Sequence, residues 1–387
     1  MTENWQEAGF GLYVHWPFCA AKCPYCDFNS HVSDRVDHAR WATALQRDLR
    51  YWAERTPGRR LSTIFFGGGT PSMMAPETLA AVIEAARGLW TPANDLEVTM
   101  EANPTSVEAD RFAAFADAGV NRLSLGLQAL DDGALRRLGR QHDVREGLAA
   151  LEVSKSVVDR VSFDLIYARQ DQTAKAWETE LRQALDLAGE HLSLYQLTIE
   201  PGTVFARRAA VGKLRGLPDE DRAVDLWNIT QDLCAAAGLT RYETSNHARP
   251  GTEARHNLIY WRGGDWLGVG PGAHGRLSFG TARLATVAHR APGTWLDRNE
   301  TTGSGTESED ALPPAEVAEE YLLMGLRTRD GIDLGRLRRL GGDVDASSLG
   351  RMVELGMVST SGDRLRTTEA GALLLDAILA ELSPIEP

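Results

Sequence analysis

The first two hundred residues alternate six times between a short apolar run and a stretch whose apolar residues recur at helical spacing. Each run is rich in β-branched and aromatic residues, as a buried strand is. The six runs cover residues 10–16, 61–68, 95–103, 122–128, 160–168 and 191–200. Strands joined by helical crossovers form a parallel sheet that helices cover. Six units are too few for a closed eight-fold barrel, so we expect an α/β fold, a partial (β/α)6 TIM-like barrel with an open side.

A chemically distinctive group lies at the end of each of these runs. The carboxyl ends of parallel strands meet at one edge of a βα sheet, where sites form. The groups are three cysteines, the glycine turn 67–71, Glu101, Gln128, Asp164 and Glu200. One such residue is an ordinary solvated loop residue, but six around one rim predict a binding site.

Three cysteines follow the first run with the spacing C-x3-C-x2-C: Cys19, Cys23 and Cys26. The fourth cysteine, Cys234, lies in an apolar helical segment and is expected to be a buried core thiol. Three thiolates without a fourth leave one metal position open, which suits an iron–sulfur cluster that binds a small molecule. A structural zinc site is the alternative, because His15 or His31 would complete a Cys3His set.

The cysteine loop, the GGGTP turn and Glu101 resemble those of the radical S-adenosylmethionine superfamily. Three cysteines hold a 4Fe-4S cluster there, and the fourth iron is left for S-adenosylmethionine. Further strings resemble the group of oxygen-independent coproporphyrinogen III oxidases and their relatives, the HemW-type heme chaperones. These strings are YVHWPFC, FFGGGTPS, EANP, NRLSLGLQ, SFDLIYA, SLYQLTIEPGT, SNHA, HNLIYW and GVGPGAH. The resemblance covers nearly the whole chain and implies a radical S-adenosylmethionine barrel.

The resemblance also implies roles for single residues. The cluster ligands would be Cys19, Cys23 and Cys26, with Tyr13 and Tyr25 packed around the cofactor. The contacts to S-adenosylmethionine would come from Gly68, Gly69, Thr70, Glu101, Gln128, Arg140 and Asp164. Backbone groups of the glycine turn would meet the amino group of the cofactor. Glu101 would bind a ribose hydroxyl, and Arg140 would pair with a carboxylate.

The string HNLIYW combines an imidazole with two aromatic side chains, which can offer an axial nitrogen and flat apolar surfaces to a porphyrin. The resemblance associates this string with heme in the chaperone group. It implies heme contacts from His256, Asn257, Tyr260 and Trp261. A packed cluster without heme is the alternative, and His247 and His274 are rival ligands.

Two departures from the oxidases favour the chaperone group. The oxidases have a further cysteine where this chain has Phe28, and they carry a longer segment before Tyr13. A third departure lies after the DLIY string. The group has glycine-x-proline-glycine-glutamine-threonine there, whereas this chain runs from Ala168 to Thr173 as ARQDQT. The shape of that loop, and with it part of the cofactor pocket, is left open.

The chain changes character after the sixth run. We predict a partial barrel over 1–240, with the iron–sulfur loop, and loops with the heme motif and a connector over 241–310. Residues 311–387 are expected to form a HemN-like C-terminal domain, whose helices and short hairpin are winged-helix-like. Residues 316–387 carry eight basic and thirteen acidic side chains, so a lid or docking role is expected rather than binding of DNA.

Charge and hydropathy limit the partners and the compartment. A net charge of −13 argues against general affinity for nucleic acid. No apolar run has the length of a membrane span, and the first residues lack the order of a secretion signal, so we expect a cytoplasmic protein.

The sequence therefore predicts a heme chaperone that binds heme, carries a 4Fe-4S cluster and S-adenosylmethionine, and hands heme to acceptor proteins such as respiratory-chain components. It is expected to lack coproporphyrinogen oxidase activity; whether S-adenosylmethionine is cleaved is left open. A radical S-adenosylmethionine oxidase acting on a porphyrinogen and a structural zinc protein are the alternatives. A peripheral membrane contact and a homodimer are further options for its partners.

Overall fold

One sheet of twelve strands organises the described part of the chain, in the order β14-β13-β12-β11-β1-β4-β5-β6-β7-β8-β10-β9. The computed structural model describes residues 4–33 and 35–383. The six predicted strands are confirmed as its centre, and neighbours pair in parallel. They are β1 (Phe10–Trp16), β4 (Arg60–Gly68), β5 (Thr91–Ala102), β6 (Arg122–Gln128), β7 (Arg160–Tyr167) and β8 (His191–Gln196).

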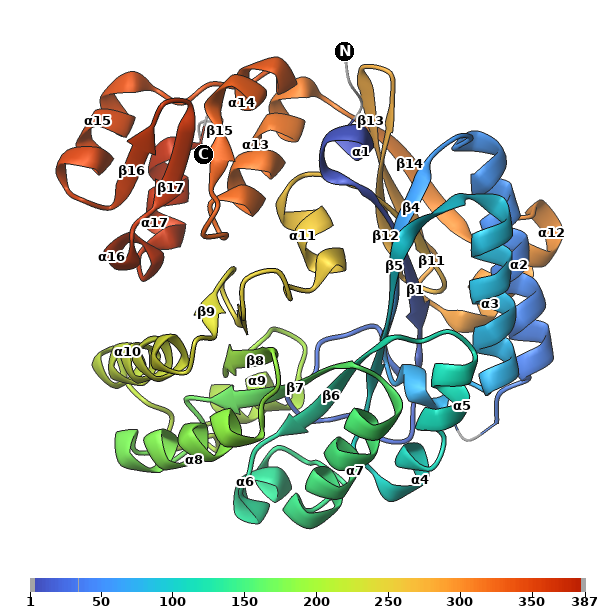
Figure 1. Ribbon diagram of the computed structural model, residues 1–387, viewed down its shortest axis with the longest axis horizontal. Coiled ribbons are helices and arrows are strands. Elements are labelled where there is room, and N and C mark those ends of the chain that lie inside the picture. Colours follow the sequence, from blue (N-terminus) through green and yellow to red (C-terminus); the bar gives the residue numbers. More distant parts are fainter. Residues whose placement is uncertain (1–3, 34, 384–387) are drawn as a thin grey trace.

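Helices between these strands pack against the outside of the sheet (Figure 1). The predicted first-turn position of Pro76 is confirmed, because Pro76 begins α3. The helices of this layer are α2 (His38–Arg55), α3 (Pro76–Leu89), α4 (Ser106–Ala109), α5 (Phe112–Asp117), α6 (Asp132–Arg137), α7 (Val144–Val157), α8 (Ala174–Leu187), α9 (Val204–Ala210) and α10 (Glu220–Ala236), with a 3-10 turn, η1, over Pro71–Met73. This arrangement confirms the α/β partial barrel.

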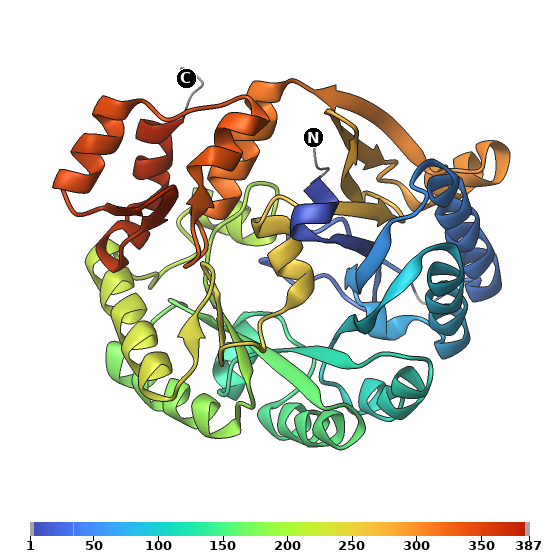
Figure 2. The same ribbon diagram turned by 45° about the horizontal axis from the view of Figure 1, so that its top comes forward.

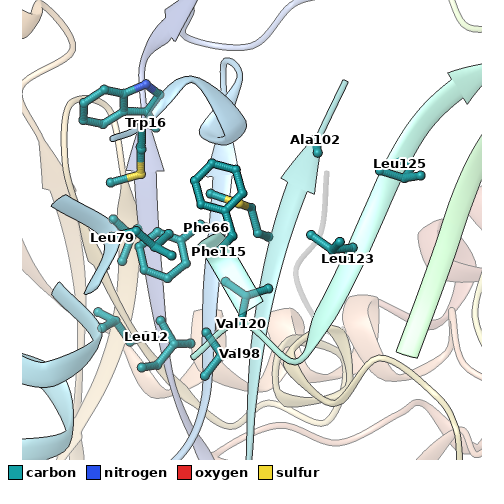
Figure 3. Packing of buried hydrophobic residues seen from close by; sticks show 14 of the residues in the cluster. Leu12, Trp16, Phe66, Leu79, Val98, Ala102, Phe115, Val120, Leu123 and Leu125 are labelled. Carbon is teal, nitrogen blue, oxygen red and sulfur yellow. The ribbon is translucent and has the colours of Figure 1, made fainter. Parts of the chain in front are cut away.

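The main hydrophobic core lies between the sheet and this helical layer. Alternate residues of β1 point into it, including Leu12 and Trp16, both without exposed surface. Figure 3 shows Phe66 of β4 packed near Leu79 and Phe115 of the helical layer. The other residues of β1, Tyr13 and His15 among them, face the barrel interior, so one strand serves the core and the site at once.

Residues 265–312 extend the sheet beyond β1, so the loops predicted over 241–310 are wrong for this stretch. The added strands are β11 (Asp265–Val269), β12 (His274–Phe279), β13 (Ala282–Ala288) and β14 (Thr306–Leu312). β11 pairs with β1 in parallel, and β12 to β14 continue antiparallel. Frequent glycines in GVGPGAHG suggested loops, whereas several of them let neighbouring strands approach closely: a Cβ on Gly268 would lie 2.2 Å from the carbonyl oxygen of His274.

The remaining elements of this part lie at the sheet ends or inside the barrel. Figure 2 shows α11 within the ring of helices. These elements are α1 (Asn4–Ala8), β2 (Phe18–Cys19), β3 (His31–Val32), β9 (Thr240–Arg241), β10 (Asn246–Ala248), α11 (Arg255–Trp261) and α12 (Pro292–Thr302). Residues 255–261, for which the sequence predicted a loop, therefore form a helix in the barrel interior.

A second, smaller core forms the C-terminal domain. Its elements are α13 (Pro314–Gly325), β15 (Ile332–Asp333), α14 (Leu334–Leu340), α15 (Ala346–Glu354), β16 (Val358–Ser361), β17 (Arg364–Thr367), α16 (Glu369–Ala372) and α17 (Leu375–Leu382). The order of helices and the β16–β17 hairpin agree with the winged-helix-like prediction. The domain contacts both sides of the open barrel, through Arg276–Glu320 at 2.6 Å and Arg241–Glu369 at 3.4 Å. The outer limits of the predicted domains, residues 1 and 387, lie outside the described residues.

None of the helices in the described ranges combines the length and the apolar character that crossing a bilayer requires.

Candidate functional site

A cavity of about 320 Å³ opens at the carboxyl ends of the parallel strands, where the sequence predicted a site. The structure brings nearly all predicted cluster and cofactor residues to it. Those that line it are Cys19, Cys23, Tyr25, Cys26, Gly68, Gly69, Thr70, Glu101, Gln128, Arg140 and Asp164. Tyr13 lies just behind the cavity wall, and its hydroxyl is 3.0 Å from Nδ1 of His15. We call this cavity the rim pocket.

A short parallel ladder between β2 and β3 closes the cysteine loop. The amide of His31 donates to the carbonyl of Pro17 at 2.7 Å, so the two ends of the loop are fixed. Cys19 is buried, whereas Cys23 and Cys26 are half-buried and face the rim pocket. Burial raises the pKa of the Cys19 and Cys26 thiols, and a bound metal would have to supply the charge that makes them thiolates.

The thiols have donors suited to thiolate ligands. The hydroxyl of Thr70 donates to Sγ of Cys19 at 3.3 Å, and Nη1 of Arg140 donates to Sγ of Cys23 at 3.5 Å. Between residues 4 and 383, position 34 excluded, no three His, Cys, Asp or Glu side chains converge closely enough to hold a single ion. A 4Fe-4S cluster does not require such convergence, because each thiolate binds a different iron. The donor set therefore fits the cluster.

The glycine turn after β4 packs directly on the cysteine loop. A Cβ on Gly69 would lie 2.7 Å from the carbonyl oxygen of Phe18 and 3.0 Å from Sγ of Cys19, so this contact requires glycine. The amides of Gly69 and Thr70 already donate to Trp16 and Phe18. A ligand's amino group would therefore meet carbonyl oxygens of this turn, which are the acceptors that it needs.

Two half-buried carboxyl groups, Glu101 and Asp164, line the rim pocket. Burial, and then the nearby Asp164, raise the pKa of Glu101 to about 8. Burial also raises the pKa of Asp164 to about 6, although the hydroxyl of Ser124 donates to its carboxylate at 3.4 Å. Near neutral pH a protonated Glu101 can both donate and accept, which suits a ribose hydroxyl.

Arg140 points into the rim pocket, although a solvent-exposed helix arginine was the alternative for this residue. Its Nη2 donates to Oδ1 of Asn103 at 2.7 Å and to the carbonyl of Gly126 at 2.9 Å. Asn103 in turn donates to Thr70 Oγ1 at 3.2 Å. Sequence reasoning missed Asn103, although the EANP string contains it. It also missed Tyr195 of β8, which lines the same cavity.

Three residues at or after the carboxyl ends of β6 and β7 have left-handed backbone conformations. Within the described chain they are the non-glycine residues with positive φ: Gln128 at 69°, Ala168 at 57° and Asp171 at 59°. Ala168 and Asp171 occupy the two positions at which the related group has glycine. The sequence of this loop therefore differs from that of the group, but its backbone has the conformation that glycine favours. Left-handed backbone is costly for a residue with a Cβ, and such strain concentrates at functional sites.

The HNLIYW string forms most of α11, in the barrel interior. Only 1% of the His256 side chain is exposed, and both ring nitrogens have partners: Thr63 Oγ1 at 2.6 Å from Nδ1 and the Tyr260 hydroxyl at 2.6 Å from Nε2. Burial lowers the pKa of His256 to about 3. Ligation of iron by His256 stays a prediction, and it requires this ring to lose a hydrogen bond and leave the core.

The two other residues of the motif and the rival ligands differ in accessibility. Asn257 and Trp261 are half-buried. His247 is buried on β10, and its Nε2 lies 3.3 Å from Oε1 of Gln231. His274, at the start of β12, is exposed. Of the three histidines weighed as ligands, His274 alone is open to solvent.

Two family profiles match this chain. The profile described as the radical SAM superfamily matches residues 13–184, and the profile described as the HemN C-terminal domain matches residues 312–374. Among solved structures, the coproporphyrinogen III oxidase HemN of Escherichia coli superposes with a TM-score of 0.81 and 22% identity. It covers 97% of this chain and 90% of that one, and at this identity the likeness establishes the fold.

Curated relatives extend over almost the whole chain. The radical S-adenosyl methionine domain-containing protein 1 of Bos taurus is 38% identical over 384 residues, 96% of this chain and 86% of the relative. The heme chaperone HemW of Escherichia coli is 38% identical over 374 residues, covering 95% and 96%. HemW of Mycobacterium tuberculosis is 35% identical over 377 residues, covering 96% and 94%. The chain therefore belongs to the radical S-adenosylmethionine superfamily, in the family that contains heme chaperone HemW and radical S-adenosyl methionine domain-containing protein 1.

Proposed function

We propose that this protein is a heme chaperone: it binds heme, holds a 4Fe-4S cluster with S-adenosylmethionine in the rim pocket, and passes heme to acceptor proteins in the cytoplasm. The observation that carries this proposal is end-to-end identity of 35–38% to relatives named heme chaperone HemW. The rim pocket supports it, because its cysteines, carboxyl groups and arginine fit the cofactors of the superfamily.

In this proposal Cys19, Cys23 and Cys26 hold the cluster, which with S-adenosylmethionine supplies one-electron chemistry when bound. Arg140 has a fixed position beside Cys23 and can pair with the carboxylate of a bound amino acid group. Glu101 receives a ribose hydroxyl. The barrel with its sheet extension and the C-terminal domain, which begins near residue 311, act as separate units, the second as a docking domain for acceptors.

Heme is assigned to the face of β11–β13 that carries His274. Residues directly opposite in antiparallel strands share a face, so His274 and Arg276 lie beside Val287 and Trp266. Trp266 and Val287 are half-buried and offer apolar surface to a porphyrin ring. Partial burial of the imidazole, then the cations Arg276 and Arg290, lower the pKa of His274, which keeps the ring neutral, the form that ligates iron.

The charges around this face also support the assignment of heme to it. Arg276 is held by Glu320, whereas Arg290 is exposed and forms no ion pair within the described residues, so it is available to a propionate. The HNLIYW motif lies on the same side of the sheet, and its Tyr260 packs edge-on against Trp266 with ring centroids 4.7 Å apart. On this assignment the motif supports the heme face and His274 supplies the axial nitrogen.

Hemin titration of the full chain, followed in the Soret region, tests both whether the chain binds heme and which histidine ligates the iron. We expect saturation at about one heme per chain, and loss of the ligand-dependent Soret shift in His274→Ala but not in folded His256→Ala. Circular dichroism verifies that each variant is folded. Absence of saturable binding in the unmodified chain would refute the heme function itself. If His274→Ala binds hemin normally and folded His256→Ala does not, the axial ligand is His256 of α11 rather than His274.

A further inference from the structure

A second cavity, of about 130 Å³, lies at the opposite end of the barrel from the rim pocket. Arg122, Arg160 and His191 are the first residues of β6, β7 and β8, and all three line it. Because these strands are parallel, their amino ends meet at one edge and place the three side chains together. We call this cavity the base pocket. It is too small for a porphyrin or for S-adenosylmethionine.

Arg122 is buried in the base pocket with most of its hydrogen-bonding capacity unused. Only 3% of its surface is exposed. Within the described chain its side chain makes one hydrogen bond, from Nη2 to Oγ of Ser162 at 2.9 Å, and no carboxylate lies within 4 Å. A guanidinium has five N–H donors, and a buried cation without a counter-charge is costly. The position therefore calls for an acceptor that carries negative charge.

The nearest carboxylate that acts on Arg122 is already engaged. Glu97 is fully buried and pairs with Nη1 of Arg160 at 2.6 Å. It also accepts the backbone amides of His256 at 3.1 Å and Arg255 at 3.3 Å. Nε of Arg255 lies 3.7 Å from the same carboxylate. Glu97 thus already serves the guanidinium groups of Arg160 and Arg255 and the start of α11, and it makes no direct ion pair with Arg122.

His191 provides a second unused donor in the base pocket. Its side chain is 4% exposed, and Nε2 lies 2.8 Å from the hydroxyl of Tyr242. That hydroxyl accepts the amide of Ala254 at 3.3 Å, so its proton is free to go to Nε2, which leaves the ring proton on Nδ1. Nδ1 has no partner among the described residues. A ligand that accepts hydrogen bonds would satisfy it.

We propose that the base pocket binds a small oxyanion of the phosphate or sulfate class. Arg122 supplies the charge and several donors, His191 supplies Nδ1–H, and Lys155 and Arg160 add positive charge at the wall. Two exposed carboxylates, Asp159 and Glu190, also line the pocket and weaken anion binding. An anion that binds only the folded state stabilises it by an amount that grows with the logarithm of the anion concentration once this exceeds the Kd.

The test is binding of inorganic phosphate to the full chain by equilibrium dialysis, and thermal unfolding across a phosphate series at constant ionic strength. We expect saturable binding near one per chain and a melting temperature that rises with phosphate. Arg122→Gln should weaken binding at least tenfold, while Arg87→Gln, which changes an exposed arginine elsewhere, should leave it unchanged.

Asp159→Asn gives a test that does not depend on a buried substitution. Removal of this opposing carboxylate should tighten phosphate binding, by about threefold or more. Two results would overturn the oxyanion site: no phosphate effect beyond that of sodium chloride, which would mean that water fills the pocket, or equal binding in Arg122→Gln, Asp159→Asn and the unmodified chain.

Discussion

Two glutamates on β5, four residues apart and on the same face of the strand, behave in opposite ways. Glu97 lies at the base of the barrel. Burial raises its pKa, but the guanidinium groups of Arg122 and Arg160 outweigh burial and hold the pKa below its usual range. Glu101 lies at the rim, where burial and the neighbouring Asp164 raise the pKa to about 8. The same residue type is thus ionised at one end and protonated at the other.

The difference separates structure from ligand binding. Glu97 uses its oxygens to hold Arg160 and the start of α11, so it has no capacity left for a ligand. Glu101 accepts the backbone amide of Gly68 and otherwise faces the rim pocket. His256 resembles Glu97, because both its nitrogens have partners, whereas Arg140 keeps an Nε without a partner among the described residues. Unused hydrogen-bonding capacity, rather than a motif alone, marks the residues that await a ligand.

Loss of one rim thiol should have the largest effect. Cys23→Ala should abolish the 4Fe-4S cluster after anaerobic reconstitution with iron and sulfide, because two thiolates do not hold it. Iron and sulfide analysis with the absorbance spectrum measures this. Cys234→Ala is the matched control, since Cys234 is buried in the core and should leave the cluster intact. Stoichiometric zinc and no iron-dependent absorbance in the unmodified chain would contradict the assignment.

Removal of the buried imidazole should test the structural role of α11. His256→Ala deletes a ring that stacks on Phe65 at 5.0 Å and leaves Thr63 and Tyr260 without their partner. We expect a loss of about 3 kcal/mol in the free energy of unfolding, measured by urea denaturation. His274→Ala, at an exposed position, should change it by less than about 0.5 kcal/mol. Equal stability of the two variants would contradict a structural role for the His256 ring.

The raised pKa of Glu101 should make stability depend on pH. The folded state keeps the proton up to about pH 8, whereas the unfolded chain releases it near the ordinary glutamate value of 4.5. The folded state therefore binds more protons in between, and stability falls as the pH rises through this window. Between pH 6 and pH 8 we expect a loss of about 2 kcal/mol that Glu101→Gln reduces. An unchanged pH profile in Glu101→Gln would show that Glu101 is ionised like Glu97.

The smallest effect is expected at the strained loop beside the rim pocket. Ala168 has a φ of 57°, so Ala168→Gly should relieve a left-handed penalty while adding freedom to the unfolded chain. The relieved penalty is the larger of these two effects, so we expect the free energy of unfolding to rise by about 0.5 kcal/mol. Thermal denaturation measures it, with Ala174→Gly, in the first turn of α8, as a control that should destabilise. Destabilisation by both substitutions would show that Ala168 is not strained.

The sequence sufficed for the six parallel strands and for the residues at their carboxyl ends, because strand period and strand-end chemistry are local signals. It did not reveal that His256 is buried. That burial depends on Gly11, where a Cβ would lie 3.0 Å from the His256 ring, and on Thr63, both far away in the chain. The strand β11 was missed for a related reason: its pairing with β1 joins segments more than two hundred residues apart, and β12 to β14 add to the sheet beyond β11.

Transfer of heme is the most direct measurement of the proposed function. The hemin-loaded full chain, freed of excess hemin, is mixed with apomyoglobin as an acceptor, and the Soret spectrum is followed. A chaperone should release heme to the acceptor until close to one heme per chain has moved. Failure to bind hemin saturably, or retention of all bound heme beside excess acceptor, would contradict a role as a heme chaperone.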